Sequence, residues 1–206
     1  EEWSENERAW AERYFEYEIS PVLSHTPVHP DHAFPRVLNK SLNFLVTVRG
    51  ESAGGVSETE VVVRVPEASP SVVRLPPEGA DGVYRFALLS DIVAEHVDRL
   101  FPAREVESSV AFRVTRDSDV EVDAEEADDL RRALEDELLA RPFGDPVRLE
   151  VPADADPATV ERLRDAFGID ADRCLRLDGP LGLDRLAGIR DRVDRPDLEY
   201  DGFVPG

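Results

Sequence analysis

SLNFLVTVR, residues 41–49, decides the fold class, because apolar side chains occupy every second position in it, at 42, 44, 46 and 48. A period of two is typical of a strand with one buried face. A second apolar run, EVVVRV at 60–65, follows the Gly- and Ser-containing stretch GESAGGVSETE at 50–60. The stretch at 50–60 is predicted to be a loop, and the two runs are predicted to pair as a hairpin.

Capping signals predict two helices. In WSENERAWAERYFEYEISP, Ser4 and Glu7 have the spacing of a capping box, and Pro21 is expected to end the helix that follows. Asp156 and Pro157 open a second helix with proline at its first position, and Gly168 is expected to end it. The Pro-rich stretch between the first helix and the hairpin is predicted to be a connector.

Further elements alternate along the chain. VYRFALL at 83–89 predicts a strand that runs into a helix capped by Ser90. FRVTRDSDVEVDAEEADDL at 112–130 begins as a strand, and Asp123 with Glu126 predicts a capped helix in its acidic half. PVRLEV predicts another strand, and CLRLDGPLGLDRLAGI predicts a short strand, a turn and a short helix.

The mixture of paired strands and strand–helix alternation predicts an α+β fold, with a mixed sheet, hairpins and packed helices. The length of 206 residues fits a single domain, with two lobes as the alternative. We expect that domain to occupy residues 1–196. The Pro- and Gly-containing tail, residues 197–206, is predicted to be a linker.

The charge balance excludes one class of partner. The formal net charge is -21, from 24 basic and 45 acidic residues, and Lys40 is the only lysine. Nucleic-acid binding relies on basic neutralisation of phosphates, so nucleic acid is not an expected partner. The acidity fits either adaptation to high salt or a base-composition bias. If salt adaptation is the cause, the melting temperature should rise with KCl.

No apolar run approaches the ~20 residues of a membrane helix, so no transmembrane segment is expected. Cys174 is the only cysteine and fits a reducing compartment. A cytoplasmic location is therefore predicted.

Two constellations in the RVTRDSD segment carry possible chemistry. Arg113 and Arg116 are candidates for contact with phosphate through their guanidinium groups. Asp117 and Asp119 would share one face of a strand and could hold a magnesium ion. The alternatives are that the arginines balance nearby carboxylates and that the aspartates belong to a polar turn.

A histidine cluster, HTPVHPDH, offers His25, His29 and His32 with Asp31. These side chains are zinc ligands by type, and histidine can also act as a covalent nucleophile. Their place in a Pro-interrupted loop favours a structural role instead. The sequence lacks phosphate-binding glycine loops, a nucleophile elbow and paired-cysteine motifs, which argues against a self-contained enzyme.

Taken together, the segments resemble the middle, or head, domain of the large bacterial-type polyphosphate kinases. The resemblance covers nearly the whole chain. It is carried by SPVLSHTPVHPDHAFPRVLNKSLNFLV, FPAREVESSVAFRVTRDSDVEVDAEEADDLRRALEDEL, VRLEV, RLDGPLGLDRLAGI and DRPDLEYDGFVP, in that order. Departures from the family pattern are Ala33 after His32, Glu199 in place of lysine, and Asp201-Gly202 in place of a Pro-Pro pair.

The resemblance implies an enzyme that reversibly transfers the terminal phosphate of ATP to polyphosphate, through a phosphohistidine and with magnesium. It places the catalytic histidines, phosphate-binding arginines and metal site in C-terminal domains similar to phospholipase D, which are outside this sequence. None of His25, His29, His32 and His96 matches the nucleophile motif. The fragment alone is thus expected to be inactive and to bind neither ATP nor magnesium by itself.

For the head domain the resemblance implies contacts with the remaining domains, a homodimer or tetramer, and a wall of the tunnel around ATP and polyphosphate. It leaves Arg113 and Arg116 as the candidates that face phosphate or the tunnel. It also implies a cytoplasmic enzyme, with attachment to the inner face of the membrane as an alternative.

The absence of methionine and the opening EEWSENE lead us to expect a piece of a longer chain. Two other hypotheses remain open. One is a stand-alone acidic protein-interaction module without enzymatic activity. The other is a small metal-dependent phosphotransferase that uses Asp117 and Asp119.

Overall fold

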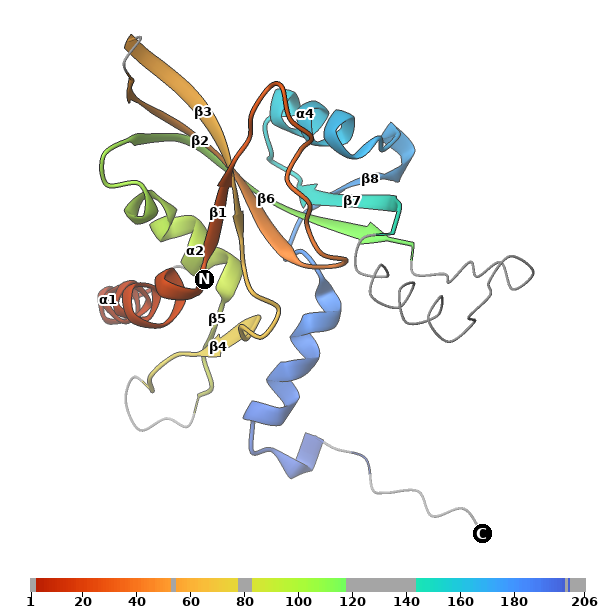
Figure 1. Cartoon of the computed structure of the whole chain (residues 1–206). Coiled ribbons are helices and arrows are strands. Elements are labelled where there is room, and N and C mark those ends of the chain that lie inside the picture. The colour runs from red at the N-terminus through yellow and green to blue at the C-terminus, as the bar shows by residue number, and fades with distance from the viewer. Residues whose placement is uncertain (1–2, 53–54, 78–82, 118–143, 199, 201–206) are drawn as a thin grey trace, which may run out of the picture.

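The computed structural model describes residues 3–52, 55–77, 83–117, 144–198 and 200. A six-stranded sheet runs through the molecule in the order β1-β3-β2-β6-β7-β8, and β4 pairs with β5 in a small second sheet (Figure 1). All neighbours pair antiparallel except β7 and β8, which are parallel. The strands are β1 Ser24–Pro27, β2 Leu42–Ser52, β3 Gly55–Arg64, β4 Val72–Arg74, β5 Phe86–Leu88, β6 Glu105–Arg116, β7 Pro146–Pro152 and β8 Cys174–Leu177.

The helices α1 Glu5–Tyr14, α2 Leu89–His96 and α4 Pro157–Phe167 cover this sheet from two sides (Figure 1). The predicted α+β fold with a mixed sheet is thereby confirmed. Among the described residues, no helix combines the length and apolar character needed to cross a membrane.

The β2–β3 hairpin is longer than predicted. Pairing runs from Asn43 opposite Arg64 to Ser52 opposite Gly55, so most of the predicted loop at 50–60 is strand. That prediction was wrong because polar side chains such as Ser57 and Glu58 are exposed while the backbone stays paired. Polarity alone therefore gave no sign that the strands continued.

The central strands are buried on both faces, which corrects the prediction of a half-buried strand. On β2, Phe44, Val46 and Val48 face a core with α1 and α2. Leu45, between them, faces a second core with α4. Each face of the sheet has its own helical cover, so the side chains of β2 find apolar partners on both sides.

Both ends of α4 and the start of α1 follow the predicted capping. Ser4 and Glu7 make the reciprocal bonds of the capping box, at 2.8 Å and 3.2 Å. Asp156 accepts from the backbone N–H of Thr159 at 2.9 Å, and Gly168 ends α4 with φ 62°. After α1 the chain continues as a π-helix, Phe15–Ile19, and a 3₁₀ turn, Ser20–Val22, before it becomes extended.

The prediction of Ser90 as a helix cap was wrong. Leu88 is the N-cap of α2, and the Ser90 hydroxyl donates to Asp91 instead. The N–H of Leu89 donates to the carbonyl of Ser71 at 2.9 Å, so a backbone acceptor from before β4 serves the start of the helix. A backbone hydrogen bond from a residue distant in sequence therefore takes the place of the predicted side-chain cap.

The sequence patterns missed β1 and β4. β1 lies inside the Pro-rich connector, and its four residues pair with Arg64–Val61 of β3 at the edge of the sheet. β4 has only three residues, which pair with β5. Strands this short carry too few side chains for a period of two to be visible.

The C-terminal part follows the predicted order of strand, turn and helix. After β8 the chain forms a 3₁₀ helix, Leu183–Arg192, and a 3₁₀ turn, Pro196–Leu198. The division into a domain at 1–196 and a linker at 197–206 stays a prediction. The helix predicted after Asp123 lies outside the described residues.

Candidate functional site

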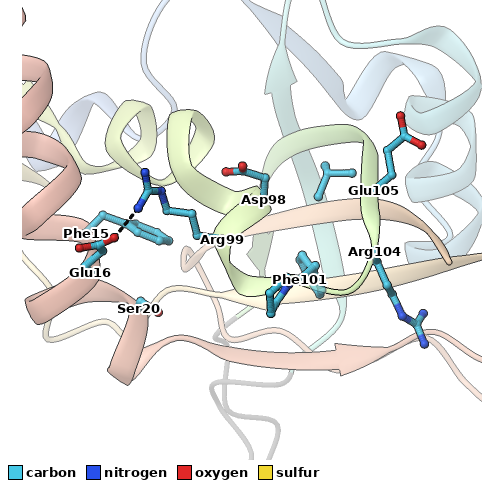
Figure 2. Close-up of a pocket in the computed structure, with 10 residues that line it drawn as sticks. Phe15, Glu16, Ser20, Asp98, Arg99, Phe101, Arg104 and Glu105 are labelled. Carbon is cyan, nitrogen blue, oxygen red and sulfur yellow. Dashed lines mark hydrogen bonds and ion pairs between the residues drawn. The ribbon is translucent and has the colours of Figure 1, made fainter.

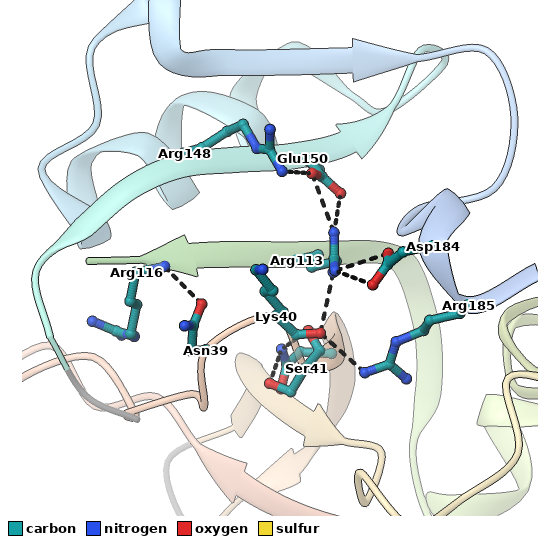
Figure 3. Close-up of polar contacts among 10 residues, drawn as sticks. Asn39, Lys40, Ser41, Arg113, Arg116, Arg148, Glu150, Asp184 and Arg185 are labelled. Atoms are coloured by element: carbon teal, nitrogen blue, oxygen red, sulfur yellow. Dashed lines mark hydrogen bonds and ion pairs between the residues drawn. The ribbon is translucent and has the colours of Figure 1, made fainter. Parts of the chain in front are cut away.

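The register of the sheet places Arg113 in the middle of a polar cluster. Arg113 of β6 lies directly opposite Glu150 of β7, so both side chains project from the same face. Their ion pair joins Nη1 and Oε2 at 3.1 Å, and the two side chains are 5% and 6% exposed. The Nη2 of Arg113 also reaches Asp184 at 3.1 Å (Figure 3). Arg113 therefore joins β6, β7 and the C-terminal 3₁₀ helix.

The turn before β2 supplies the third side of the cluster. Lys40 has a φ of 58°, a left-handed conformation that is uncommon for a residue with a side chain. Its N–H donates to the Val114 carbonyl at 2.8 Å. Its carbonyl accepts from Arg113 Nε at 3.1 Å and from Arg185 Nη2 at 3.0 Å. These contacts hold the backbone of the turn against β6.

A glycine makes room for the Arg113 side chain. Gly182 has a φ of 70°, and a Cβ added there would lie 3.2 Å from the Arg113 guanidinium carbon. Such a contact is tighter than ordinary packing, and the backbone conformation disfavours other residues as well. The DGPLGLD segment therefore contributes both a glycine seat and the Asp184 carboxylate to the same arginine.

We call the six connected residues the arginine junction: Lys40, Arg113, Arg148, Glu150, Asp184 and Arg185. Arg148 joins it through Nη2, which lies 2.8 Å from Glu150 Oε1. The junction holds four basic and two acidic side chains, a formal charge of +2, within a chain whose net charge is -21.

Arg116 is buried nearby but has different partners. Its guanidinium donates to the carbonyls of Val37 at 3.0 Å and Gly144 at 2.8 Å, and it lies over the Phe167 ring. Its backbone N–H donates to Asn39 Oδ1 at 2.8 Å. Burial, followed by the neighbouring Arg36 charge, lowers the pKa of Arg116 below its ordinary value.

Both arginines singled out from the sequence thus have protein acceptors, and their contact with phosphate stays a prediction. Asp117 is exposed just after β6, and Asp119 lies outside the described residues. The proposed pairing of these aspartates is therefore not described. Within the described ranges, no group of three or more His, Cys, Asp or Glu side chains is arranged to hold a metal ion.

The histidine cluster is spread along exposed connector. The rings of His29 and His32 meet edge to face at 5.5 Å, while His25 approaches Phe101 at 6.2 Å. His96, on α2, lies against Phe15 at 5.6 Å. His25, His29 and His32 are exposed, and each of the four rings has one other ring nearby.

A cavity of about 690 Å³ lies between the π-helix and the turn that leads into β6 (Figure 2). Arg99 in its wall is held by Glu12 and Glu16. The cavity lining carries two arginines and three carboxylates, those of Glu16, Asp98 and Glu105. An acidic balance of this kind is unsuited to a phosphate ligand.

Sequence reasoning found the two arginines but missed Glu150, Asp184 and Gly182. The alternation of PVRLEV does place Arg148 and Glu150 on one face of an otherwise apolar strand. That pattern shows a shared face but not whether the face is buried: Glu150 is 6% exposed, whereas Arg148 is 43% exposed. No sequence pattern showed that Asp184, 71 residues from Arg113, would reach it.

Comparison with known proteins identifies the same family as the resemblance carried by the motifs that meet at the junction. Residues 6–189 match the family model described as the polyphosphate kinase middle domain. The chain is 44% identical to a polyphosphate kinase of Paraburkholderia phytofirmans, over 100% of this chain and 29% of that protein. It is 42% identical to a polyphosphate kinase of Neisseria meningitidis, over 99% of this chain and 30% of the relative.

The fold is also similar to a solved structure. The crystal structure of polyphosphate kinase from Porphyromonas gingivalis matches with a TM-score of 0.69 and 21% identity, over 100% of this chain and 28% of that one. The chain spans less than a third of the length of these relatives. It belongs to the polyphosphate kinase family and corresponds to the middle domain of that family.

Proposed function

We propose that this chain is the non-catalytic head domain of a polyphosphate kinase. The parent enzyme would reversibly transfer the terminal phosphate of ATP to polyphosphate through a phosphohistidine that lies outside these 206 residues. The carrying observation is the coverage: relatives named polyphosphate kinase match 99–100% of this chain with only 29–30% of their own length.

The contacts of the described residues support a framework role. The motifs behind the resemblance bind one another, because FRVTR, NKSLN and DGPLGLD meet at the arginine junction. The histidines have packing contacts, and the described carboxylates form no metal-binding group. In this proposal the catalytic histidine and the magnesium belong to other domains of the parent enzyme.

The head domain would shape the tunnel for ATP and polyphosphate and take part in a homodimer or tetramer of a cytoplasmic enzyme. Arg113 and Arg116 would then act by fixing the tunnel wall, with direct phosphate contact as the stronger form of the proposal. Residues 1–196 would form this domain, and 197–206 would lead to a catalytic domain.

Radiolabelled ATP tests the division of labour. The chain, and a longer protein that contains it, are each incubated with labelled ATP, magnesium and polyphosphate. We expect turnover and a labelled histidine in the longer protein only. A labelled histidine within residues 1–206 would contradict the proposal, and an inactive, unlabelled longer protein would favour the acidic interaction module instead.

A further inference from the structure

The arginine junction leaves positive charge at the protein surface. Lys40 is exposed, and within the described part of the chain its ammonium group makes no hydrogen bond or ion pair. Arg148 is 43% exposed, and among the described residues it forms one ion pair, with Glu150. Glu150 is also the partner of Arg113, so one carboxylate serves two guanidinium groups. The charge of Arg148 is only partly compensated.

Two shielded polar atoms, one on Thr115 and one on Arg148 itself, lack hydrogen-bond partners among the described residues. Thr115 of β6 lies directly opposite Arg148 of β7, so their side chains share a face. Thr115 Oγ1 and Arg148 Nε are both shielded from solvent and make no hydrogen bond. Because protein covers both atoms, a ligand at this face would contact the exposed end of the Arg148 side chain, and the unpaired donor behind it leaves the charge of Arg148 further uncompensated.

The turn that contains Lys40 lies beside the same part of β6. The Lys40 N–H is bonded to the Val114 carbonyl, which places the turn beside Val114 and Thr115. Figure 3 shows the Lys40 side chain extending from the turn along β6, between Arg113 and Arg116 in that view. The contacts of its carbonyl with Arg113 and Arg185 fix the backbone from which the ammonium projects.

We propose that Lys40 and Arg148 bind the phosphoryl oxygens of a phosphoric anhydride. Lysine supplies a point charge and arginine a planar set of donors, and the two together suit phosphate. Arg113 is a positioning residue, because it holds both Glu150 and the Lys40 turn. The inference rests on the proposed function, and it moves direct contact from the two buried arginines to their exposed neighbours.

Steady-state kinetics of the longer kinase that contains this chain test the inference, with polyphosphate and ATP varied separately. We expect Lys40→Gln and Arg148→Gln each to raise one KM by about tenfold, the effect of losing a charge-assisted hydrogen bond, with kcat nearly unchanged. Lys40→Arg, which keeps the charge, should restore most of the loss. A change in the KM for polyphosphate alone identifies the polymer, and a change for ATP alone identifies the nucleotide.

Arg13→Gln is the matched control, since Arg13 is an exposed arginine on α1, which contributes no residue to the arginine junction. It should leave both KM values unchanged. Unchanged KM values in Lys40→Gln and Arg148→Gln, with an active wild-type enzyme, overturn the inference and leave the proposed function intact. If the wild-type enzyme transfers no phosphate, the proposed function fails. Calorimetry with polyphosphate and with ATP, on the wild type and both variants, then decides the inference.

Discussion

Two arginines of this molecule have the same kind of partners in opposite surroundings. Arg113 lies between Glu150 and Asp184, and Arg99 lies between Glu12 and Glu16 (Figures 3 and 2). The Arg113 side chain is 5% exposed, whereas that of Arg99 is 40% exposed. The comparison separates the effect of burial from the effect of pairing.

Burial changes what the loss of the arginine leaves behind. Without Arg113, Glu150 would keep a charge inside the protein, 6% exposed, with only Arg148 beside it. Without Arg99, its two glutamates would be hydrated, because both are more than 40% exposed. An unpaired buried charge costs far more than an unpaired surface charge.

Arg113→Met should therefore give the largest effect, a loss of about 3–5 kcal/mol in the free energy of unfolding. Urea denaturation of the 206-residue chain, followed by circular dichroism, measures it. Adding Glu150→Leu should recover much of the loss, because the double variant removes both charges together. A single variant within about 1 kcal/mol of wild type would show that the buried pair is not needed for stability.

Arg116 is about as buried as Arg113 but has a different kind of hydrogen-bond partner, so it separates the effect of the partner from the effect of burial. Among the described residues, its guanidinium is bonded to two carbonyls and to no carboxylate. Arg116→Met would leave neutral acceptors unsatisfied, at a cost of about 1–3 kcal/mol, which is smaller than for Arg113. The same urea titration checks the order. A loss equal to or larger than that of Arg113→Met would contradict the view that the unpaired buried carboxylate of Glu150 causes the larger loss of unfolding free energy.

Gly182 tests the packing against Arg113 without removing a charge. Gly182→Ala adds a methyl group 3.2 Å from the guanidinium at a φ of 70°, so we expect a loss of about 1–2 kcal/mol. Gly188→Ala is the matched control, because Gly188 lies nearby in sequence with open space around its Cβ position. Thermal melting of both variants measures the difference. Equal melting temperatures of the two variants would show that the absence of a side chain at Gly182 is not needed for the packing of Arg113.

The sequence was informative where the structure depends on local chemistry. The Ser4–Glu7 capping box, the Asp156 cap, the αL glycine Gly168 and the alternation in β2 are set by neighbouring residues, and each was predicted. The Ser90 cap failed because the carbonyl of Ser71, 18 residues away, serves the start of α2. The half-buried strand failed because a period of two does not show whether a second layer covers the other face.

The same distinction holds for the arginine junction. Arg113 and Arg116 stood out as basic residues in an acidic chain, and PVRLEV contained the signal for the Arg148–Glu150 face. The partners of Arg113 could not be predicted, because they depend on the register of β6 with β7 and on where the DGPLGLD turn returns. Register is set by the whole sheet, and it decides whether an arginine meets a carboxylate or solvent.

Arg99→Ala should have the smallest effect, below about 1 kcal/mol at low salt, since exposed pairs are weakened by hydration and by the entropy of two long side chains. Urea denaturation in low and high KCl measures it. The difference from wild type should shrink at high salt, because screening acts on solvent-exposed charges and much less on buried ones. The Arg113→Met loss should change little over the same range. If the Arg99 loss matched that of Arg113 and persisted in KCl, pairing between two carboxylates would matter more than burial, and the comparison would be reversed.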